Sequence, residues 1–317
     1  MTSRYNNYSD FLKNKYGVKV YKLPISIPVT CPNRDGTCGF EGCSFCGDIG
    51  AGYQHIPETV GIKEQIGMHK GHIIEKYKAK KFIAYFQNYS NTYLPLPVLE
   101  NYLLEACDED VVRIALATRP DCVSDNYLEK LADIKNKRKV DITIELGLQT
   151  VNYHVLEEIR RGHSLAEYLD SMQRINKYGL ESCTHVILNL PGSDRLDVIE
   201  TAKVLSAMKT TEAKIHALYI IKGTTMADEY LAGKLQLVSM DEYIERVILF
   251  LEYLDKDIVM QRLIGRAPAS HTEFSNWGEK WWNIKDKIEK ILDERDSYQG
   301  RLCDYLNGKA LKKFEIV

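Results

Sequence analysis

The sequence predicts an α/β protein built as a partial (β/α)6 TIM-like barrel with a C-terminal helical extension. Six short apolar runs, typical of buried strands, alternate with helical segments along most of the chain. Polar motifs follow several of these runs, where the carboxyl ends of parallel strands meet. Beyond about residue 225 only helical patterns remain. A doubly wound sheet fits the same alternation and stays open as the competing architecture.

The six expected strands are rich in β-branched and aromatic residues. They cover residues 23–29, 81–87, 111–118, 140–148, 182–190 and 213–221. Right-handed crossovers between such strands favour a curved, partly open barrel. In either architecture we expect the chemistry at the carboxyl ends of the strands.

Helices are expected between these strands, with Ser124 and Asp194 as N-caps and Gly179 as a C-terminal cap. Two amphipathic helices follow the last strand, over residues 240–254 and 277–295. We therefore expect a core of residues 1–225, including the N-terminal segment, and a helical extension of residues 226–317.

Composition narrows the class of protein. The 317 residues are 44% hydrophobic and 27% charged, which is typical of a soluble globular protein. The formal net charge of −2 provides no global basic field for nucleic acid. No secretory signal opens the sequence, and no apolar run approaches the length of a membrane span. We expect a cytoplasmic protein without a membrane partner.

Four of the eight cysteines lie close together in a glycine-rich segment: Cys31, Cys38, Cys43 and Cys46. In a reducing compartment such a group indicates metal binding rather than disulfides. A structural zinc site would use all four thiolates and be closed. A catalytic [4Fe–4S] cluster would use three and leave one iron open. An incidental group of reduced cysteines is the third alternative.

Several separate motifs resemble one family. They are TCPNRDGT (30–37), YFQNYSNTY (85–93), ATRPDC (117–122), ELGLQT (145–150), RRGH (160–163) and HVILNLPG (185–192). In this order they resemble the radical SAM (S-adenosylmethionine) enzymes of the YhcC/YtqA-like group, which are related to the elongator catalytic subunit. Phe45, between Cys43 and Cys46, also matches the aromatic position of the radical SAM cysteine signature.

The resemblance implies a [4Fe–4S] cluster on Cys31, Cys43 and Cys46, with the open iron binding S-adenosylmethionine. Reductive cleavage of SAM would then yield a 5′-deoxyadenosyl radical, with an electron donor such as flavodoxin or ferredoxin. This sequence departs from the family pattern at Cys38, Asn189 and Arg266. Cys38 leaves the number of cluster ligands in question, and the other two positions bear on substrate contacts.

The block after the second strand is implied to lie near the SAM amino group. It includes Gln87, Ser90, Asn91 and Thr92, whose amide and hydroxyl oxygens suit an ammonium or amine. A polar strand-to-helix turn is the alternative. Phe45 is expected to pack near the adenine, or else simply in the core.

Glu145 interrupts an apolar strand, where a carboxylate needs a partner. We assign it to the SAM ribose, with an ion pair to Arg113 or Arg119 as the alternative. Gln149, at the end of the same strand, is expected to reach cofactor or substrate. Arg119 suits the SAM carboxylate or a substrate phosphate, and a structural turn with Asp121 is an equal alternative.

Two further motifs carry weaker expectations. Arg160, Arg161 and His163 end a helix, where they either contact a substrate or complement the helix dipole. His185 is expected at a strand start, as a hydrogen-bonded core histidine away from the catalytic end.

The resemblance to the elongator branch implies a tRNA substrate. The reaction implied is conversion of a wobble uridine side chain from a 5-carboxymethylaminomethyl-type to an aminomethyl-type group. Radical SAM chemistry on a small molecule or a protein is the first alternative, supported by the near-neutral charge. A zinc-stabilised binding scaffold without catalysis is the second. The catalytic residues themselves stay unassigned.

Overall fold

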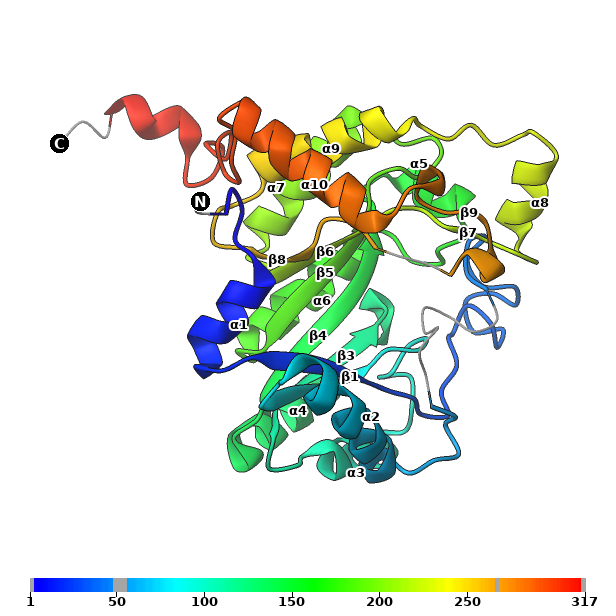
Figure 1. Ribbon diagram of the computed structural model, residues 1–317, viewed down its shortest axis with the longest axis vertical. Helices are drawn as coiled ribbons and strands as arrows, with labels where there is room; N and C mark the ends of the chain where they lie inside the picture. Colours follow the sequence, from blue (N-terminus) through cyan, green and yellow to red (C-terminus); the bar gives the residue numbers. More distant parts are fainter. Residues whose placement is uncertain (1–2, 48–55, 266–267, 315–317) are drawn as a thin grey trace.

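A computed structural model describes residues 3–47, 56–265 and 268–314. Its centre is a seven-stranded sheet in the order β1-β2-β3-β4-β5-β6-β8, with every pairing parallel. The strands are β1 (Val20–Ile25), β2 (Lys81–Phe86), β3 (Val111–Thr118), β4 (Asp141–Gln149), β5 (Glu181–Ile187), β6 (Glu212–His216) and β8 (Val259–Arg262). The sheet curls into a partial barrel (Figure 1), as predicted. Spatial order follows chain order without a switch point, which excludes the doubly wound alternative.

Helices connect the strands of the sheet (Figure 1). They are α2 (Ile62–Tyr77), α3 (Leu96–Ala106), α4 (Asp125–Arg138), α5 (Tyr153–Glu158), α6 (Leu165–Lys177), α7 (Arg195–Ala207), α8 (Thr225–Leu231), α9 (Met240–Tyr253) and α10 (Trp281–Glu294). Most of them cover the outer face of the sheet, whereas α8 lies beside β7 (Ile220–Ile221) and α10 packs on α9. Most begin and end within a few residues of the predicted positions, because their caps are local. Ser164 and Asp194, for example, each form a capping box.

Strand β4 shows how the sheet separates core from cavity. Because side chains alternate along a strand, Ile144 and Leu146 point outward into the main hydrophobic core beneath the helices. Glu145, Gly147 and Gln149 point inward and line a cavity inside the barrel. The apolar outer face fixes the register, and the inner face is free to carry polar groups.

The expectation that strands stop near residue 221 is wrong. Strand β8 adds a seventh strand beside β6, and β7 (Ile220–Ile221) pairs antiparallel with β9 (Thr272–Phe274). These strands have two to four residues, too few for a period-two pattern to stand out. The division near residue 225 stays a prediction, although β8, from the C-terminal part, belongs to the central sheet.

Helix α1 (Tyr8–Tyr16), which the sequence did not predict, lies between the two edges of the sheet (Figure 1). The amide of Met260 on β8 donates to the carbonyl of Asn6 at 2.8 Å, just before the helix. Leu12 packs inside the barrel with Ile83 and Tyr85. The helix thereby covers the gap between β1 and β8. No helix among the described residues has the length and apolar character that a membrane span needs.

Candidate active site

A cavity of about 1310 Å³ occupies the barrel interior and reaches the carboxyl ends of the strands. Ligand sites usually measure roughly 300–1000 Å³, so this one has room for more than one ligand. The loop after β1 contributes Cys31, Cys43 and Cys46 to its wall. The structure therefore brings the three predicted cluster ligands to one cavity.

The cysteine loop (residues 31–47) is held in shape by its own polar groups. The Arg34 guanidinium donates to the carbonyls of Cys46 and Gly47 at 2.7 and 2.9 Å. Backbone turns close around the first and last cysteines, since the Arg34 amide donates to the Cys31 carbonyl and the Cys46 amide to that of Cys43. The loop thus orders its thiols through local contacts.

Hydrogen-bond donors from three segments approach the thiol sulfurs. Arg161 Nη1 lies 3.4 Å from the Cys43 sulfur, and Asn33 Nδ2 lies 3.7 Å from it. Arg119 Nη1 lies 4.0 Å from the Cys31 sulfur. Cationic and amide donors stabilise thiolates and metal-bound sulfur, so these surroundings fit an iron–sulfur cluster. Burial, and then the neighbouring Cys43, raises the pKa of the Cys46 thiol when no metal neutralises it.

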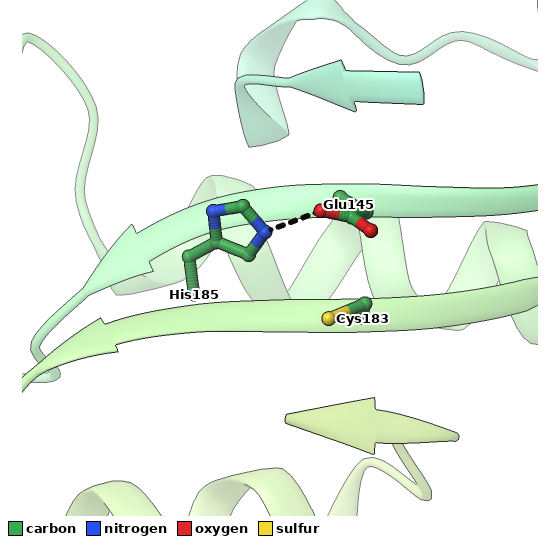
Figure 2. Close-up of side chains that lie close together, drawn as sticks. All are labelled: Glu145, Cys183 and His185. Carbon is green, nitrogen blue, oxygen red and sulfur yellow. Dashed lines mark hydrogen bonds and ion pairs between the residues drawn. The ribbon is translucent and has the colours of Figure 1, made fainter. Parts of the chain in front are cut away.

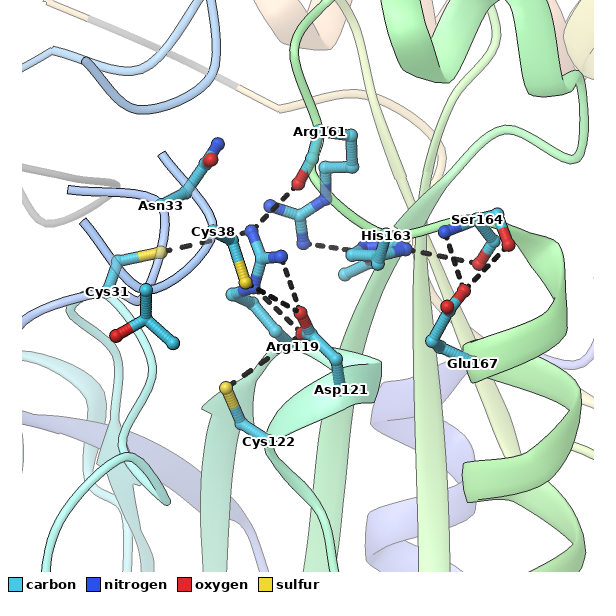
Figure 3. A network of polar contacts seen from close by, with 12 residues as sticks. Cys31, Asn33, Cys38, Arg119, Asp121, Cys122, Arg161, His163, Ser164 and Glu167 are labelled. Carbon is cyan, nitrogen blue, oxygen red and sulfur yellow. Dashed lines mark hydrogen bonds and ion pairs between the residues drawn. The ribbon is translucent and has the colours of Figure 1, made fainter. Parts of the chain in front are cut away.

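Cys38 differs from the other three cysteines of the loop. It is exposed and is not among the cavity-lining residues. Its sulfur lies 3.8 Å from an oxygen of Asp121 (Figure 3), and burial and this carboxylate raise the pKa of the thiol. A neighbouring carboxylate disfavours the thiolate that a metal needs. This geometry does not favour the closed four-cysteine zinc site.

Arg119 combines both roles that the sequence left open. Its guanidinium pairs with the Asp121 carboxylate in bidentate fashion, at 2.8 and 2.7 Å, and donates to the Arg161 carbonyl at 2.8 Å. Burial works against ionisation of Asp121, but Arg119 keeps the pKa of that carboxyl below its usual value. Arg119 also lines the cavity (Figure 3). The structural turn is present, and one edge of the guanidinium still faces the site.

Arg161 and His163 hold the end of β4. Both contact the carbonyl of Gly147, Arg161 Nη2 at 2.7 Å and His163 Nε2 at 3.2 Å. A Cβ at Gly147 would lie 2.7 Å from Arg161 Nη2, so a side chain there would displace the arginine. Burial, followed by the two nearby arginines, lowers the pKa of His163 to about 3, and the imidazole is neutral. Arg160, by contrast, is exposed and pairs with Glu41.

Five of the seven predicted cofactor-binding residues line the cavity beside the cysteines. They are Phe45, Gln87, Arg119, Glu145 and Gln149. Gln149 follows a register shift in the β4–β5 pairing and has a φ of 77°, and this irregularity re-aims its side chain. Phe45 also packs against the apolar cluster that includes Ile187 and Leu218.

Asn91 and Thr92 are placed differently. The Asn91 amide donates to the carbonyls of Phe86, Asn88 and Ala117 at 2.8–3.0 Å, and joins the ends of β2 and β3. The Thr92 hydroxyl contacts Thr118 and the Cys122 carbonyl. Neither side chain lines the cavity, so direct contact with SAM is not supported for them. The polar-turn alternative describes both better.

Glu145 lies fully buried at the middle of β4 and has several partners. Lys22 Nζ and Lys214 Nζ approach its two oxygens at 2.7 and 3.1 Å, and His185 Nε2 lies at 2.8 Å (Figure 2). Burial alone would raise the pKa of this carboxyl, but Lys214 and Lys22 hold it well below its usual range. An ion pair was the alternative expected from the sequence, although with other partners.

The arginines expected as partners of Glu145 have carboxylates of their own. Arg113 pairs with Glu181 at 2.6 Å and with Glu212, and Arg119 pairs with Asp121. Arg113 points inward nearer the amino end of the strands, where its register partner on β4 is Asp141, four residues before Glu145. The expected cations are therefore wrong, because sequence position alone did not show which inward-facing residues share a level.

The expected placement of His185 is also wrong in part. The histidine is hydrogen-bonded, as predicted, but it lines the cavity near the carboxyl end of β5. Five other polar residues of the cavity were missed: Lys22, Lys214, His216, Gln261 and Arg262. The sequence feature that could have revealed them was a charged or polar residue inside an otherwise apolar short strand.

Asn189, a departure from the family pattern, accepts from the Leu218 amide at 2.8 Å. Arg266 lies outside the described residues.

Comparison with family models gives two matches along the chain. Residues 26–205 match the radical SAM superfamily, and residues 210–294 match the radical SAM C-terminal domain. The first match contains the cysteine loop and strands β2 to β5. It covers more than half of the chain.

Known proteins give a consistent result. The chain is 36% identical over 308 residues to YtqA of Bacillus subtilis, covering 97% of this chain and 95% of that protein. It is 24% identical over 190 residues to a tRNA uridine(34) acetyltransferase of Methanocaldococcus jannaschii, covering 58% of this chain and 34% of that protein. A solved structure of Elp3 from Methanocaldococcus infernus superposes with a TM-score of 0.63 at 16% identity, covering 88% of this chain and 64% of that one.

These matches overturn the non-catalytic zinc scaffold as an explanation. The family uses a [4Fe–4S] cluster and S-adenosylmethionine, and the three cavity-lining cysteines with their hydrogen-bond donors fit that cluster. The protein is an enzyme of this kind. The chain belongs to the radical SAM superfamily, in the YhcC/YtqA-like group related to elongator.

Proposed function

We propose that this enzyme modifies the side chain of the wobble uridine in tRNA. The reaction proposed oxidises the methylene of the carboxymethyl unit in a 5-carboxymethylaminomethyl-type group, with SAM as the two-electron oxidant. Water then releases that unit as glyoxylate and leaves the aminomethyl form. The observation that carries the proposal is the similarity to a tRNA uridine(34) acetyltransferase over 190 residues, 58% of this chain. The Elp3-like fold agrees with it.

In this proposal Cys31, Cys43 and Cys46 are the cluster ligands, and Cys38 is a bystander beside Asp121. The bound cluster and SAM would supply a 5′-deoxyadenosyl radical that takes a hydrogen atom from the methylene of the carboxymethyl unit. The chain's own residues would hold the reactants in place. Asn33 and Arg161 orient the ligand sulfur of Cys43.

The side chains proposed to contact SAM are those that line the cavity near the cysteines: Phe45, Gln87, Arg119 and Gln149. The arginine fork suits a carboxylate, the two amides suit the amino and ribose groups, and the phenyl ring suits the adenine. Glu145 is satisfied by two lysines and a histidine, which favours the ion-pair alternative for it over ribose binding.

The test uses anaerobically reconstituted enzyme, a reductant, SAM and tRNA that carries 5-carboxymethylaminomethyluridine. We expect 5′-deoxyadenosine to form together with the aminomethyl nucleoside, both measured by mass spectrometry after hydrolysis of the tRNA. The Cys31→Ala variant should yield neither product. Formation of 5′-deoxyadenosine at the same rate with and without tRNA, with no change in the nucleoside, would contradict the proposal.

A small molecule or a protein is the second candidate substrate. The net charge of −2 favours it, because it provides no overall attraction for a long polyanion such as RNA. The interior cavity of about 1310 Å³ also suits a compact ligand. Salt dependence separates the two candidates. Affinity for a tRNA falls steeply with salt, whereas affinity for a small ligand changes little.

The cellular setting completes the proposal. A reduced cluster requires an electron donor such as flavodoxin or ferredoxin, and free thiols persist in a reducing compartment such as the cytoplasm. Reduction of the cluster by purified flavodoxin, followed by its absorbance spectrum, tests the choice of donor directly.

A further inference from the structure

Below the cysteine loop, charged side chains from four strands meet inside the barrel. We call Lys22 (β1), Glu145 (β4), Lys214 (β6) and Arg262 (β8) the charged layer. Each lines the same cavity as the cysteines. Glu145 precedes Gly147 by two residues, about 6.6 Å along the strand, and the Gly147 carbonyl binds the arginine that contacts Cys43. The charged layer therefore lies one level deeper than the cluster ligands.

The two lysines of the layer share one carboxylate. Lys22 Nζ lies 2.7 Å and Lys214 Nζ 3.1 Å from the oxygens of Glu145. The Tyr85 ring also lies against both ammonium groups, with its centroid 4.5 Å from Lys22 and 4.7 Å from Lys214. The aromatic face and the carboxylate hold the two cations close together in spite of their mutual repulsion.

Arg262 adds a third cation and has no carboxylate partner among the described residues. Its guanidinium lies against the His216 imidazole, and its Nε donates to the Ile215 carbonyl at 3.3 Å. Burial, and then Arg262 itself, holds the pKa of His216 well below its usual value. The imidazole is therefore neutral and leaves the charge of Arg262 unchanged. Arg262 lines the cavity, and no hydrogen bond within the described residues uses its Nη1.

The charge balance of the layer is positive. Three cations face one carboxylate, and His185 is neutral at pH 7 because burial and Lys214 lower its pKa to about 4. Glu212, on the next level toward the amino ends of the strands, is paired with Arg113 and accepts from Gln261. A walled cavity with excess positive charge concentrates anions, since burying unpaired cations is costly.

A metal ion is the other ligand that this region could suggest. One oxygen of Glu145, the Cys183 sulfur and one nitrogen of His185 lie within 4.8 Å of one another (Figure 2). However, both carboxylate oxygens are already contacted by ammonium groups, which repel a cation. The layer is built for negative charge.

We propose that the substrate carries an anionic group, a carboxylate, which binds between Lys22, Lys214 and Arg262. This inference rests on the proposed function in one respect: the carboxymethyl end of the wobble side chain is the carboxylate that reaches the layer. The layer would hold that end while the carbon beside it faces the cluster level. Glu145 then acts as a positioning residue, which holds the two lysines close together.

The test measures binding of small probes to the reconstituted holoenzyme with SAM, by anaerobic calorimetry without reductant. N-benzylglycine reproduces a ring, a methylene, an amine and a carboxymethyl group, and benzylamine is the same molecule without the carboxymethyl group. Wild-type enzyme should bind N-benzylglycine at least about tenfold more tightly, as expected for charge-assisted hydrogen bonds. Equal affinity for the two probes would overturn the proposal without any variant.

Variants then locate the site. Lys22→Gln and Arg262→Gln should each weaken N-benzylglycine binding about tenfold and leave benzylamine binding unchanged. Lys137→Gln, at a lysine whose side chain is 73% exposed on α4, is the matched control and should change neither. Unchanged N-benzylglycine affinity in both cavity variants would also overturn the proposal. If inorganic phosphate displaces N-benzylglycine more effectively than acetate does, the anion site stands but its assignment to a carboxylate is wrong.

These results are separate from the fate of the proposed function. The probes contain no RNA, so an enzyme that ignores tRNA can still show the carboxylate preference. Conversely, an enzyme that processes tRNA and shows no preference between the two probes retains the proposed function and loses the charged-layer inference.

Discussion

The cysteine loop and the charged layer face the same cavity, but the loop is one continuous segment and the layer is assembled from residues far apart in the sequence. The loop takes its ligands from 16 consecutive residues, 31–46, and shapes them with short-range hydrogen bonds from Arg34. The charged layer draws single residues from β1, β4, β6 and β8, from position 22 to position 262. They meet only because the curled sheet brings inward-facing residues of distant strands to one cavity.

This difference separates cofactor chemistry from substrate choice. A cluster needs closely spaced thiolates, so a local motif carries it and resembles the same motif in relatives. A substrate pocket needs charged side chains at one depth of the barrel. Different strands can supply these side chains, so they need no fixed spacing in the sequence. The predictions below test this division, beginning with the largest effect.

Loss of a cluster ligand should have the largest effect. Cys43→Ala should abolish formation of the brown [4Fe–4S] chromophore and reduce SAM cleavage at least about a hundredfold, since changes to groups that merely orient ligands already cost 10–100-fold. Iron content, absorbance and 5′-deoxyadenosine are the measurements. Cys38→Ala is the control and should retain cluster and activity, because its thiol lies outside the cavity. Loss of the cluster in that variant would mean that Cys38 is a ligand.

The hydrogen bond from Arg161 to the Cys43 sulfur should have the next largest effect. Arg161→Leu removes a cation beside the cluster and should lower both its reduction potential and SAM cleavage, the latter by roughly 10–100-fold. Arg160→Leu, at the exposed neighbouring position, should change neither quantity. Redox titration followed by EPR measures the potential. Equal potentials in the two variants would show that the 3.4 Å contact has no electrostatic effect on the cluster.

The charged layer should respond to pH. Burial is the main reason that the pKa of Lys214 is lowered to about 8, with Lys22 and Arg262 adding to the effect and Glu145 opposing it. Below pH 8 the ammonium is charged and binds a carboxylate. As pH rises through 8 the charge is lost, and N-benzylglycine affinity should fall by up to about tenfold per unit.

Lys214→Arg is the matched control for this pH dependence, because arginine stays protonated. Its affinity should stay flat between pH 7 and 9. Besides Lys22 and Arg262, the titratable groups that face Lys214 are Tyr85, Glu145, Cys183, His185 and His216, and the shifted pKa values of these five keep them from changing charge in this window. The same slope in both proteins would assign the titration to another group.

The smallest effect on catalysis is expected at Asn91, which joins two strand ends rather than touching the cofactor. Asn91→Ala removes the side-chain donor from the carbonyls of Phe86 and Asn88 and leaves the Ala117 carbonyl only the backbone amide of residue 91. It should lower the free energy of unfolding by about 2 kcal/mol. SAM affinity should stay within about threefold of wild type. Chemical denaturation and SAM titration measure the two quantities. Asn283→Ala, at an exposed position on α10, should stay within about 0.5 kcal/mol of wild type. A large loss of SAM affinity at normal stability would restore Asn91 to the cofactor site.

Much of the fold could be predicted because its signals are local. Strand β3 has the predicted bounds, and β2 and β4 differ from theirs by one residue. These strands read as nearly continuous apolar runs in the sequence, which is typical of the strands of a buried parallel sheet. Strand β8 and helix α1 could not be predicted, since the first has four residues and the second is stabilised by covering the sheet edges.

The site divides in the same way. The sequence by itself predicted the cluster, because its proposed ligands Cys31, Cys43 and Cys46 lie in one loop whose shape is set by neighbouring residues. Only the tertiary structure decided that Asn91 and Thr92 turn away from the cavity, and that Glu145 pairs with Lys22 and Lys214. The physical reason is that strand register and barrel curvature set which inward-facing side chains share a level. Register depends on the packing of all seven strands, so no local pattern contains it.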